Sequence, residues 1–280
     1  MSDFQQRVTL GRSGLQVSRL GLGSSFQAPT ASYLEAFERG VNYFYWGSIR
    51  RKLMGDAISE IARKQREELV VVVQSYSRWS RHLRGSVEKA IRKLGIDYAD
   101  VLLLGWHNQP PSRAVLDAAL ELRERGRVRW LALSSHRRTL FPTLLDDERY
   151  AIWHLRYNAC HRGAEHEVFP ACSDRAPEQR PGVVTYTTTR WGHLCDPGRT
   201  PPGERTPTGT DCYRFALTHP SVDLCLAGPN DAEQMSQALA ALERGPLDAE
   251  EVAWMQRVGD HIYGADRSSG MRDGASAAAS

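Results

Sequence analysis

Eight short apolar runs, each followed by an amphipathic stretch, constrain the fold of this chain more than any other feature of its sequence. The runs are rich in valine, isoleucine and leucine and hardly alternate with polar residues, which is typical of parallel strands buried on both faces. They lie at residues 18–23, 41–45, 69–74, 100–104, 128–134, 151–155, 183–187 and 222–226. Eight such strands joined by helices predict an α/β fold, a closed (β/α)8 TIM barrel.

The stretches between these runs show the apolar spacing of helices. Helices are expected at residues 31–39, 54–63, 83–94, 113–125, 140–147, 165–173, 210–218 and 231–242. An extra C-terminal helix is predicted from residue 248 to about 262, because an Asp cap and an acidic first turn begin it. Turn chemistry at residues 11–14 predicts an N-terminal β-hairpin over one barrel mouth. Residues 1–265 are expected to form one domain, and the small, polar segment 266–280 is expected to be disordered.

Composition excludes several classes of protein. The chain has 280 residues, of which 41% are hydrophobic and 25% charged, an ordinary globular balance. Its net charge of +3 is too small to suggest a nucleic-acid partner. No stretch approaches the roughly 20 apolar residues of a membrane span, and the start of the chain does not look like a signal peptide. We therefore expect a cytoplasmic protein with a small-molecule partner, no membrane contact and an oligomeric state that the sequence leaves open.

The cysteines fit the same location. They are odd in number and widely spaced, with no CxxC pair, which is typical of a reducing compartment. They are Cys160, Cys172, Cys195, Cys212 and Cys225. The histidines His136, His161 and His193 match no ligand spacing either, so no metal site is expected.

Several segments together resemble the aldo-keto reductase family, from about Val8 to Tyr263. LGRSGLQVSRLGLGS resembles that family's opening hairpin and first strand, SVEKAIRKLGIDYADVLLLGWHNQP its third helix and fourth strand, and LRERGRVRWLALSS its fourth helix and fifth strand. YNACHRGAEHEVFPAC and PGVVTYTTTRWGHL resemble its sixth and seventh strand exits. The resemblance implies a barrel with its site at the carboxyl ends of the strands.

The resemblance also implies a catalytic tetrad of Asp, Tyr, Lys and His, and this chain departs from it at every position. Tyr45 stands at the aspartate position, Arg50 at the tyrosine position and Tyr76 at the lysine position. Gly105 stands at the histidine position, with His107 two residues further on. The chain's four lysines all lie away from these places, so no lysine lowers the pKa of a tyrosine there.

The candidate catalytic residues are therefore Tyr45, Tyr76, His107 and Arg50. A tyrosine can donate a proton, and His107 or Arg50 can stabilise the phenolate or a developing oxyanion. Tyr76 and His107 are expected to approach each other, because they follow neighbouring strands. The alternative is that these aromatic side chains fill the space that the tetrad and a substrate have left.

The resemblance further implies a nicotinamide cofactor, with NADP as the expected one and NAD left open. Ser134, Ser135 and His154 stand where the family contacts the carboxamide through a Ser-Asn pair and a Gln. By the same resemblance Tyr186 would stack on the nicotinamide and Thr187 would contact the pyrophosphate. Gly228, Asn230 and Gln234 lie in a loop before a helix, where free backbone N–H groups favour phosphate.

The predicted function is that of an atypical oxidoreductase acting on a small carbonyl- or imine-like substrate. Two alternatives remain at this point. One is a barrel without redox chemistry that serves as a binding or accessory protein. The other is an isomerase or dehydratase that uses Tyr76 and His107 for acid and base catalysis.

Overall fold

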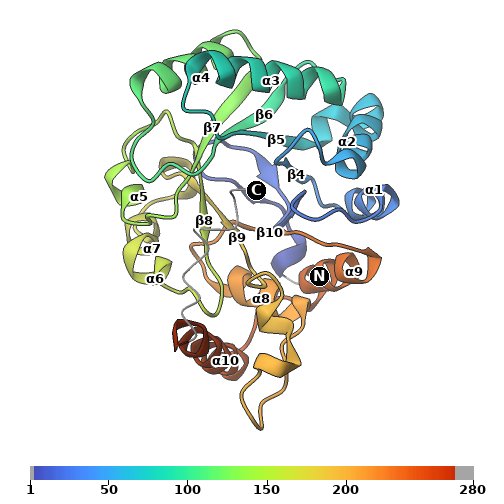
Figure 1. Cartoon of the computed structure of the whole chain (residues 1–280), viewed down its shortest axis with the longest axis vertical. Helices are drawn as coiled ribbons and strands as arrows, with labels where there is room; N and C mark the ends of the chain where they lie inside the picture. Colours follow the sequence, from blue (N-terminus) through green and yellow to red (C-terminus); the bar gives the residue numbers. More distant parts are fainter. Residues whose placement is uncertain (1–2, 269–280) are drawn as a thin grey trace.

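Eight parallel strands close into a barrel in the computed structural model, which describes residues 3–268 (Figure 1). The barrel strands are β3 (Leu20–Gly23), β4 (Tyr43–Trp46), β5 (Val70–Ser75), β6 (Ala99–Leu104), β7 (Val128–Ser134), β8 (Ile152–Arg156), β9 (Gly182–Tyr186) and β10 (Leu224–Ala227). Each pairs with the next along the chain, and β10 pairs with β3 to close the ring. The predicted fold class is confirmed, and the strand ends differ from the predicted ones by at most two residues.

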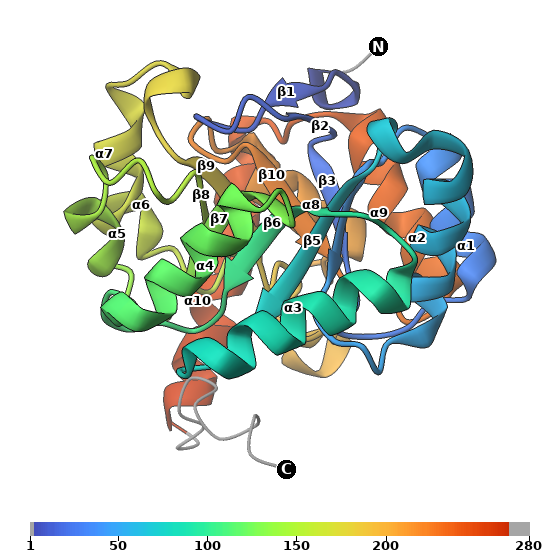
Figure 2. The ribbon, with the colours of Figure 1, turned by 90° about the horizontal axis from the view of Figure 1, so that it is seen from above.

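Helices surround the barrel on its outside (Figures 1 and 2). They are α1 (Thr30–Glu38), α2 (Lys52–Gln65), α3 (Ser80–Leu94), α4 (Arg113–Glu124), α5 (Leu140–Thr143), α6 (Ala164–Glu167), α7 (Phe169–Ser173), α8 (Gly209–Thr218), α9 (Ala232–Arg244) and α10 (Ala249–Ser268). Short 3-10 helices are η1 (Asp3–Gln5), η2 (Arg66–Glu68), η3 (Pro177–Gln179), η4 (His193–Cys195) and η5 (Pro197–Arg199). Among the described residues, no helix is both long enough and apolar enough to cross a bilayer.

Three helix predictions need correction. The helix expected at 140–147 ends after one turn, and beyond its end the Leu145 carbonyl accepts a hydrogen bond from the Arg12 guanidinium at 2.7 Å. The helix expected at 165–173 is divided at Val168, since Pro170 has no N–H to donate and clashes with a continuous helix. The last helix continues past 262 to Ser268, so the first residues of the segment expected to be disordered are helical. The remainder of that segment, 269–280, lies outside the described residues.

The N-terminal hairpin covers the amino-terminal mouth of the barrel, as predicted. Its strands are β1 (Val8–Thr9) and β2 (Gln16–Val17), and Figure 2 shows them at one end of the barrel. Leu10 of the hairpin is fully buried against the inner core of the barrel. Gly11 has φ +52°, and a Cβ there would lie 1.9 Å from the Gly182 nitrogen, so only glycine fits this contact. The carboxyl-terminal mouth is the end left for a ligand.

Two layers of buried side chains hold the barrel together. Residues such as Val72, Leu103 and Ile152 point inward and fill its interior, while alternate strand residues face the helices. Each fully buried side chain of this kind stabilises the fold by about 1.5–3 kcal/mol. The interior is therefore a packed core that supports the strand ends.

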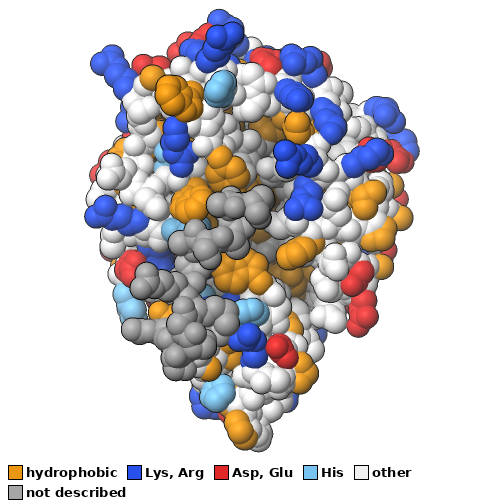
Figure 3. Space-filling model, in the orientation of Figure 1, with side chains coloured by type: hydrophobic (Ala, Val, Ile, Leu, Met, Phe, Trp, Pro, Cys, Tyr) orange, Lys and Arg blue, Asp and Glu red, His pale blue; other side chains and the backbone are white. Residues whose placement is uncertain are grey.

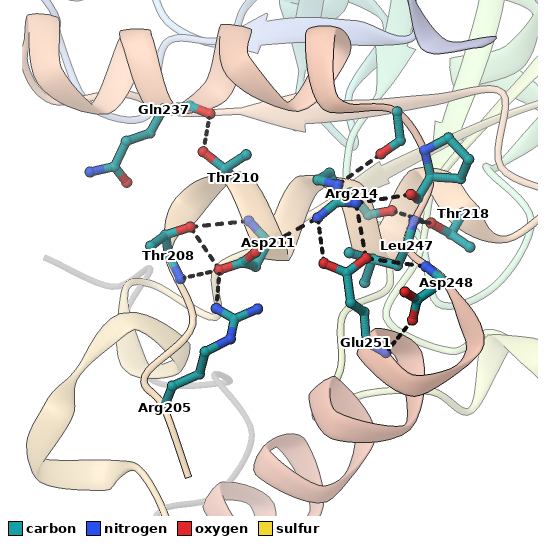
Figure 4. Close-up of polar contacts among 12 residues, drawn as sticks. Arg205, Thr208, Thr210, Asp211, Arg214, Thr218, Gln237, Leu247, Asp248 and Glu251 are labelled. Atoms are coloured by element: carbon teal, nitrogen blue, oxygen red, sulfur yellow. Dashed lines mark hydrogen bonds and ion pairs between the residues drawn. The ribbon is translucent and has the colours of Figure 1, made fainter. Parts of the chain in front are cut away.

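A polar network fixes the last helix to its neighbours (Figure 4). Thr208 and Asp211 form a capping box at the start of α8. Arg214 of α8 pairs with Glu251 of α10 at 2.9 Å and donates to the carbonyls of Gly245 and Pro246. These contacts hold α8, whose first turn borders the cavities described below.

Candidate active site

A cavity of about 390 Å³ opens at the carboxyl ends of the barrel strands. Strands β6 and β10 contribute apolar side chains to it, and five other strands contribute polar ones: Tyr45 on β4, Gln74 on β5, Ser134 on β7, His154 on β8 and Tyr186 on β9. Among the described residues that line it, none is an Asp, Glu, Lys or Arg. The space where a charged tetrad was sought is thus surrounded by phenols, hydroxyls and imidazoles.

Tyr45 and Tyr76 lie next to each other in this cavity. Tyr45 lies on β4 and Tyr76 directly follows the neighbouring strand β5, and they occupy the positions at which the resemblance implies an aspartate and a lysine. Burial, with further contributions from Tyr76, raises the pKa of Tyr45 well above its usual value. Two phenols therefore stand where an ion pair was expected.

Gly105 makes room for that pair. A Cβ at this position would lie 2.7 Å from two carbons of the Tyr76 ring, closer than Cβ atoms approach other side chains. A histidine at position 105, which the resemblance implies, cannot coexist with the ring of Tyr76 in its present place. The loss of the histidine and the gain of the tyrosine are sterically linked.

The residue after Gly105 turns the chain sharply. Trp106 has φ +53°, a conformation that costs a non-glycine residue on the order of 1–3 kcal/mol. Its N–H donates to the Ser134 hydroxyl at 2.8 Å, and its ring lies over His136 with the centroids 5.2 Å apart. Trp106 and His136 thereby form one side of the cavity mouth.

His107 and Arg50 do not line the cavity. His107 is buried, and its Nε2 lies 3.2 Å from the Arg78 guanidinium, so burial and that cation lower its pKa to about 4. The described contacts include no hydrogen bond between His107 and Tyr76. Arg50 is exposed in the loop before α2, where its N–H donates to Ser48 Oγ at 3.2 Å. Of the four catalytic candidates, the structure brings together Tyr45 and Tyr76 only.

His154 lies at the base of the cavity. Its Nε2 is 2.9 Å from the Tyr43 hydroxyl, and its ring meets Tyr45 edge on with the centroids 5.9 Å apart. Burial lowers the pKa of His154 to about 3. The imidazole is therefore neutral at physiological pH.

A second cavity of about 450 Å³ adjoins the first. The two cavities share five lining residues, Phe26, Thr189, Trp191, Tyr213 and Gly228. The candidate cofactor residues Ser134, His154, Tyr186, Thr187 and Gly228 line the first cavity, and Gly228, Asn230 and Gln234 line the second. Ser135 is the exception, since it is buried behind the rim and donates to the Arg137 carbonyl at 3.0 Å.

The amino terminus of α9 borders the second cavity. Asp231 caps the helix by accepting from the Gln234 N–H at 2.8 Å, and the Gln234 side chain accepts from the Asn230 N–H at 3.0 Å. Asp231 and Glu233 add negative charge to this rim, and no lysine or arginine lines it within the described residues. The rim can offer backbone N–H groups to one phosphate group. No described residue that lines it is a cation that could bind a second phosphate group.

Strained backbone follows strand β9. Thr187, Arg190 and Trp191 have φ of 59°, 50° and 54°, and Gly192 continues the left-handed run. The buried Arg190 guanidinium contacts the His161 ring, with Nη1 2.7 Å from Nε2. This contact holds a conformation that places the Trp191 side chain, 52% exposed, against both cavities. Strain of this kind clusters at ligand sites.

Phe26, Thr189 and Tyr213 are among the lining residues that were not candidates from the sequence. Phe26 was findable, because it follows the exit of the first barrel strand by three residues, as the other site residues follow their strands. Tyr213 lies inside α8 and carries no signal in the sequence. In the described part of the chain no three His, Cys, Asp or Glu side chains are grouped as metal ligands.

Comparison with known proteins gives one consistent picture. No family model matches the chain. It is 23% identical over 237 residues, 66% of this chain and 71% of the relative, to an NADH-specific methylglyoxal reductase from Escherichia coli. The holo form of an aldo-keto reductase from Bacillus halodurans matches with a TM-score of 0.75 at 22% identity, over 90% of this chain and 96% of that one.

A second solved structure agrees. An aldo/keto reductase from Klebsiella pneumoniae, in complex with NADP and acetate, matches with a TM-score of 0.73 at 18% identity, over 91% of this chain and 96% of that one. The likeness inferred from the sequence motifs is confirmed, and the chain has the fold of the aldo-keto reductases.

Proposed function

We propose that this chain is an oxidoreductase of the aldo-keto reductase type that binds a nicotinamide cofactor across the two adjoining cavities. Its substrate would be a small, neutral carbonyl- or imine-like molecule. The observation that carries this proposal is the neighbouring position of Tyr45 and Tyr76, whose phenol groups line a cavity that adjoins the one at the α9 amino terminus.

The residues present fit such a cofactor. Gly23 and Gly228 line the first cavity without side chains, and a Cβ at Gly228 would have only ordinary contacts, at 3.7 Å and beyond. Tyr186 offers a ring and Thr187 a hydroxyl for the nicotinamide end, and Asn230 lies beside the α9 amino terminus for the phosphate end. When bound, the cofactor supplies or accepts the hydride.

The cofactor expected from the sequence is NADP, and the solved neighbours include an NADP complex. The curated relative, however, is named for NADH. The acidic rim formed by Asp231 and Glu233 supports NADH at least as well, because a carboxylate suits a ribose hydroxyl better than a 2′-phosphate. We therefore propose that the binding of NADH and the binding of NADPH be measured in parallel.

The tyrosine pair defines what chemistry is feasible. Either phenol can offer its hydroxyl proton to a substrate oxygen or nitrogen. Because burial raises the pKa of Tyr45, this phenol is a weak general acid and assists hydride transfer to a carbonyl only weakly. The site therefore suits activated carbonyls, which need less acid assistance, or imines that arrive already protonated.

A binding role without hydride transfer is the second candidate. The raised pKa of Tyr45 and the absence of charged lining residues, among those described, both favour it. An isomerase using Tyr76 and His107 has no such support, since His107 contacts Arg78 instead of the cavity. None of the five cysteines, all of which lie in the described part of the chain, forms a disulfide bond, and this supports the expected cytoplasmic location.

Titration with NADH and NADPH, followed by tryptophan fluorescence, is expected to show saturable binding, because Trp106 and Trp191 line the cavity. Gly228→Leu should weaken cofactor binding at least about tenfold, because the leucine side chain would project where the two cavities meet. A tenfold loss of affinity corresponds to only ~1.4 kcal/mol. Gly85→Leu, exposed on α3 with nothing within 4 Å of its Cβ, is the control. If neither cofactor binds at millimolar concentration, the redox proposal fails.

Turnover of ordinary aldehydes is expected to be slow even with cofactor bound. A tuned general acid contributes about 10²–10⁴-fold, and no lysine lines this cavity to tune one among the described residues. The measurement is oxidation of the reduced cofactor with simple aldehydes, α-dicarbonyl compounds and imines in parallel. Faster turnover of the activated substrates supports the proposal, whereas rapid turnover of unactivated aldehydes would show that another group supplies the proton.

A further inference from the structure

Two cysteines lie in contact beside the second cavity, and the proposed function does not use them. Cys195 Sγ and Cys212 Sγ are 3.9 Å apart. Cys195 ends η4 in the loop after β9, and Cys212 lies in the first turns of α8. A disulfide bond is about 2.05 Å long, so the two sulfur atoms need to move only about 2 Å to form one.

The two thiols differ in access and in chemistry. Cys195 is half-buried and lines the second cavity, whereas Cys212 is fully buried behind it. Either thiol can donate in the contact between the two sulfur atoms, and this contact with Cys212 lowers the pKa of Cys195. Cys195 is thus placed to react first with a small oxidant from the cavity, and Cys212 is placed to react second.

We propose that Cys195 and Cys212 form a reversible disulfide in response to hydrogen peroxide, and that this bond reshapes the proposed cofactor cavity. The Cys195 thiolate attacks one peroxide oxygen, the O–O bond breaks, and the hydroxide released takes up a proton to become water. Cys212 then attacks the sulfur of the resulting sulfenic acid and gives up its proton, which leaves with the hydroxyl as a second water. Two thiols are oxidised and one peroxide is reduced.

The effect on the cavity follows from the backbone between the two cysteines and strand β9. The Cys195 N–H donates to the Gly192 carbonyl at 2.9 Å, so a shift of Cys195 is transmitted to the residues just before it. Those residues, Arg190 to Gly192, form the left-handed run that positions Trp191 against both cavities. Oxidation should therefore displace Trp191. This second part of the inference rests on the proposed function, but the disulfide itself does not.

The disulfide is tested on the full chain by exposing it to hydrogen peroxide under native conditions. Free thiols are then counted after denaturation, and cross-linked peptides are mapped by mass spectrometry. The wild-type protein should lose two thiols, regain both with dithiothreitol and yield a 195–212 cross-link. Cys212→Ala should instead accumulate a sulfenic acid at Cys195 that dimedone traps. Cys172→Ala, at a buried cysteine outside the cavity lining, should behave like the wild type.

Three results would overturn the disulfide: no loss of thiols, a cross-link between other cysteines such as Cys160 and Cys212, or a loss of two thiols in Cys212→Ala, as in the wild type.

The cavity effect is tested separately by titrating NADH and NADPH into the reduced and oxidised proteins. A several-fold change in affinity with altered tryptophan fluorescence is expected, and equal affinities would refute it. If the reduced protein binds neither cofactor, the proposed function fails while the mapped disulfide still stands.

Discussion

Replacing Asp223 by alanine is expected to lower the free energy of unfolding by about 3–5 kcal/mol. Its two carboxylate oxygens accept from the Arg180 guanidinium at 2.7 Å each, and one of them also accepts from the Val183 N–H at 2.7 Å. Arg180 and Asp223 are both buried, so the variant leaves a cation and a backbone donor without partners away from water. Equilibrium unfolding in urea measures the loss.

The matched control is Asp146→Ala. Asp146 pairs with Arg175 at the same distance of 2.7 Å, but its side chain is 84% exposed, so the expected loss is below about 1 kcal/mol. A second variant, Arg180→Met with Asp223→Leu, removes both charges and should recover much of the stability. Equal losses from Asp223→Ala and Asp146→Ala would show that burial does not govern this pair.

The contribution of Asp223 to the site is indirect. The ion pair joins Arg180, just before β9, to Asp223, just before β10, at the amino-terminal ends of these strands. The opposite ends of the same strands carry Tyr186 and Gly228 to the cavities. A variant that survives as a folded protein should therefore be examined for weaker cofactor binding as well.

The barrel strands could be predicted from the sequence because each is buried on both faces and therefore apolar along its whole length. Helix ends were harder, since they depend on contacts between distant segments. The segment just after α5 contacts the distant hairpin, where Arg12 donates to the Leu145 carbonyl, and no local pattern near residue 145 shows this. The division at Val168 was visible in principle, because Pro170 interrupts the helical pattern.

The site was predictable only where a residue follows directly from its strand. Tyr45 and Tyr76 stand at strand exits, and the structure brings them together. The expected partner of Tyr76 was His107, but the left-handed Trp106 redirects the chain and His107 meets Arg78. A single left-handed residue is a backbone property that residue types alone do not reveal, especially at a tryptophan.

Tyr76 and Gly105 occupy two of the positions at which the resemblance implies charged or titratable residues, and these two residues depend on each other sterically. Since a Cβ at position 105 would meet the Tyr76 ring at 2.7 Å, restoring a histidine alone should displace that ring from its place beside Tyr45. The positions at which the resemblance implies Asp, Lys and His therefore act as one unit in this chain. Their replacements have to be judged together and not one at a time.

The neutral histidine at the base of the cavity makes stability depend on pH. The pKa of His154 is lowered from 6.5 to about 3, so below pH 6.5 the unfolded chain binds a proton that the folded chain does not. The free energy of unfolding therefore has its full value above about pH 6.5. It falls by about 1.4 kcal/mol per pH unit as the pH decreases toward 3. The pKa of His107 is lowered to about 4, so this residue also lowers the free energy of unfolding as the pH decreases from about 6.5 to 4.

His154→Gln is expected to remove the share of this dependence that comes from His154, while the share from His107 remains. A glutamine side chain can keep a hydrogen bond to the Tyr43 hydroxyl, now 2.9 Å from His154 Nε2, but it does not titrate. Urea unfolding between about pH 7 and pH 5 should show a shallower fall in stability, by ~1.4 kcal/mol per pH unit. His166→Gln, at an exposed position on α6, controls for the substitution and should keep the wild-type slope. If His154→Gln keeps that slope too, His154 is protonated in the folded protein, and the cavity then holds a positive charge that suits an anionic substrate better than a neutral one.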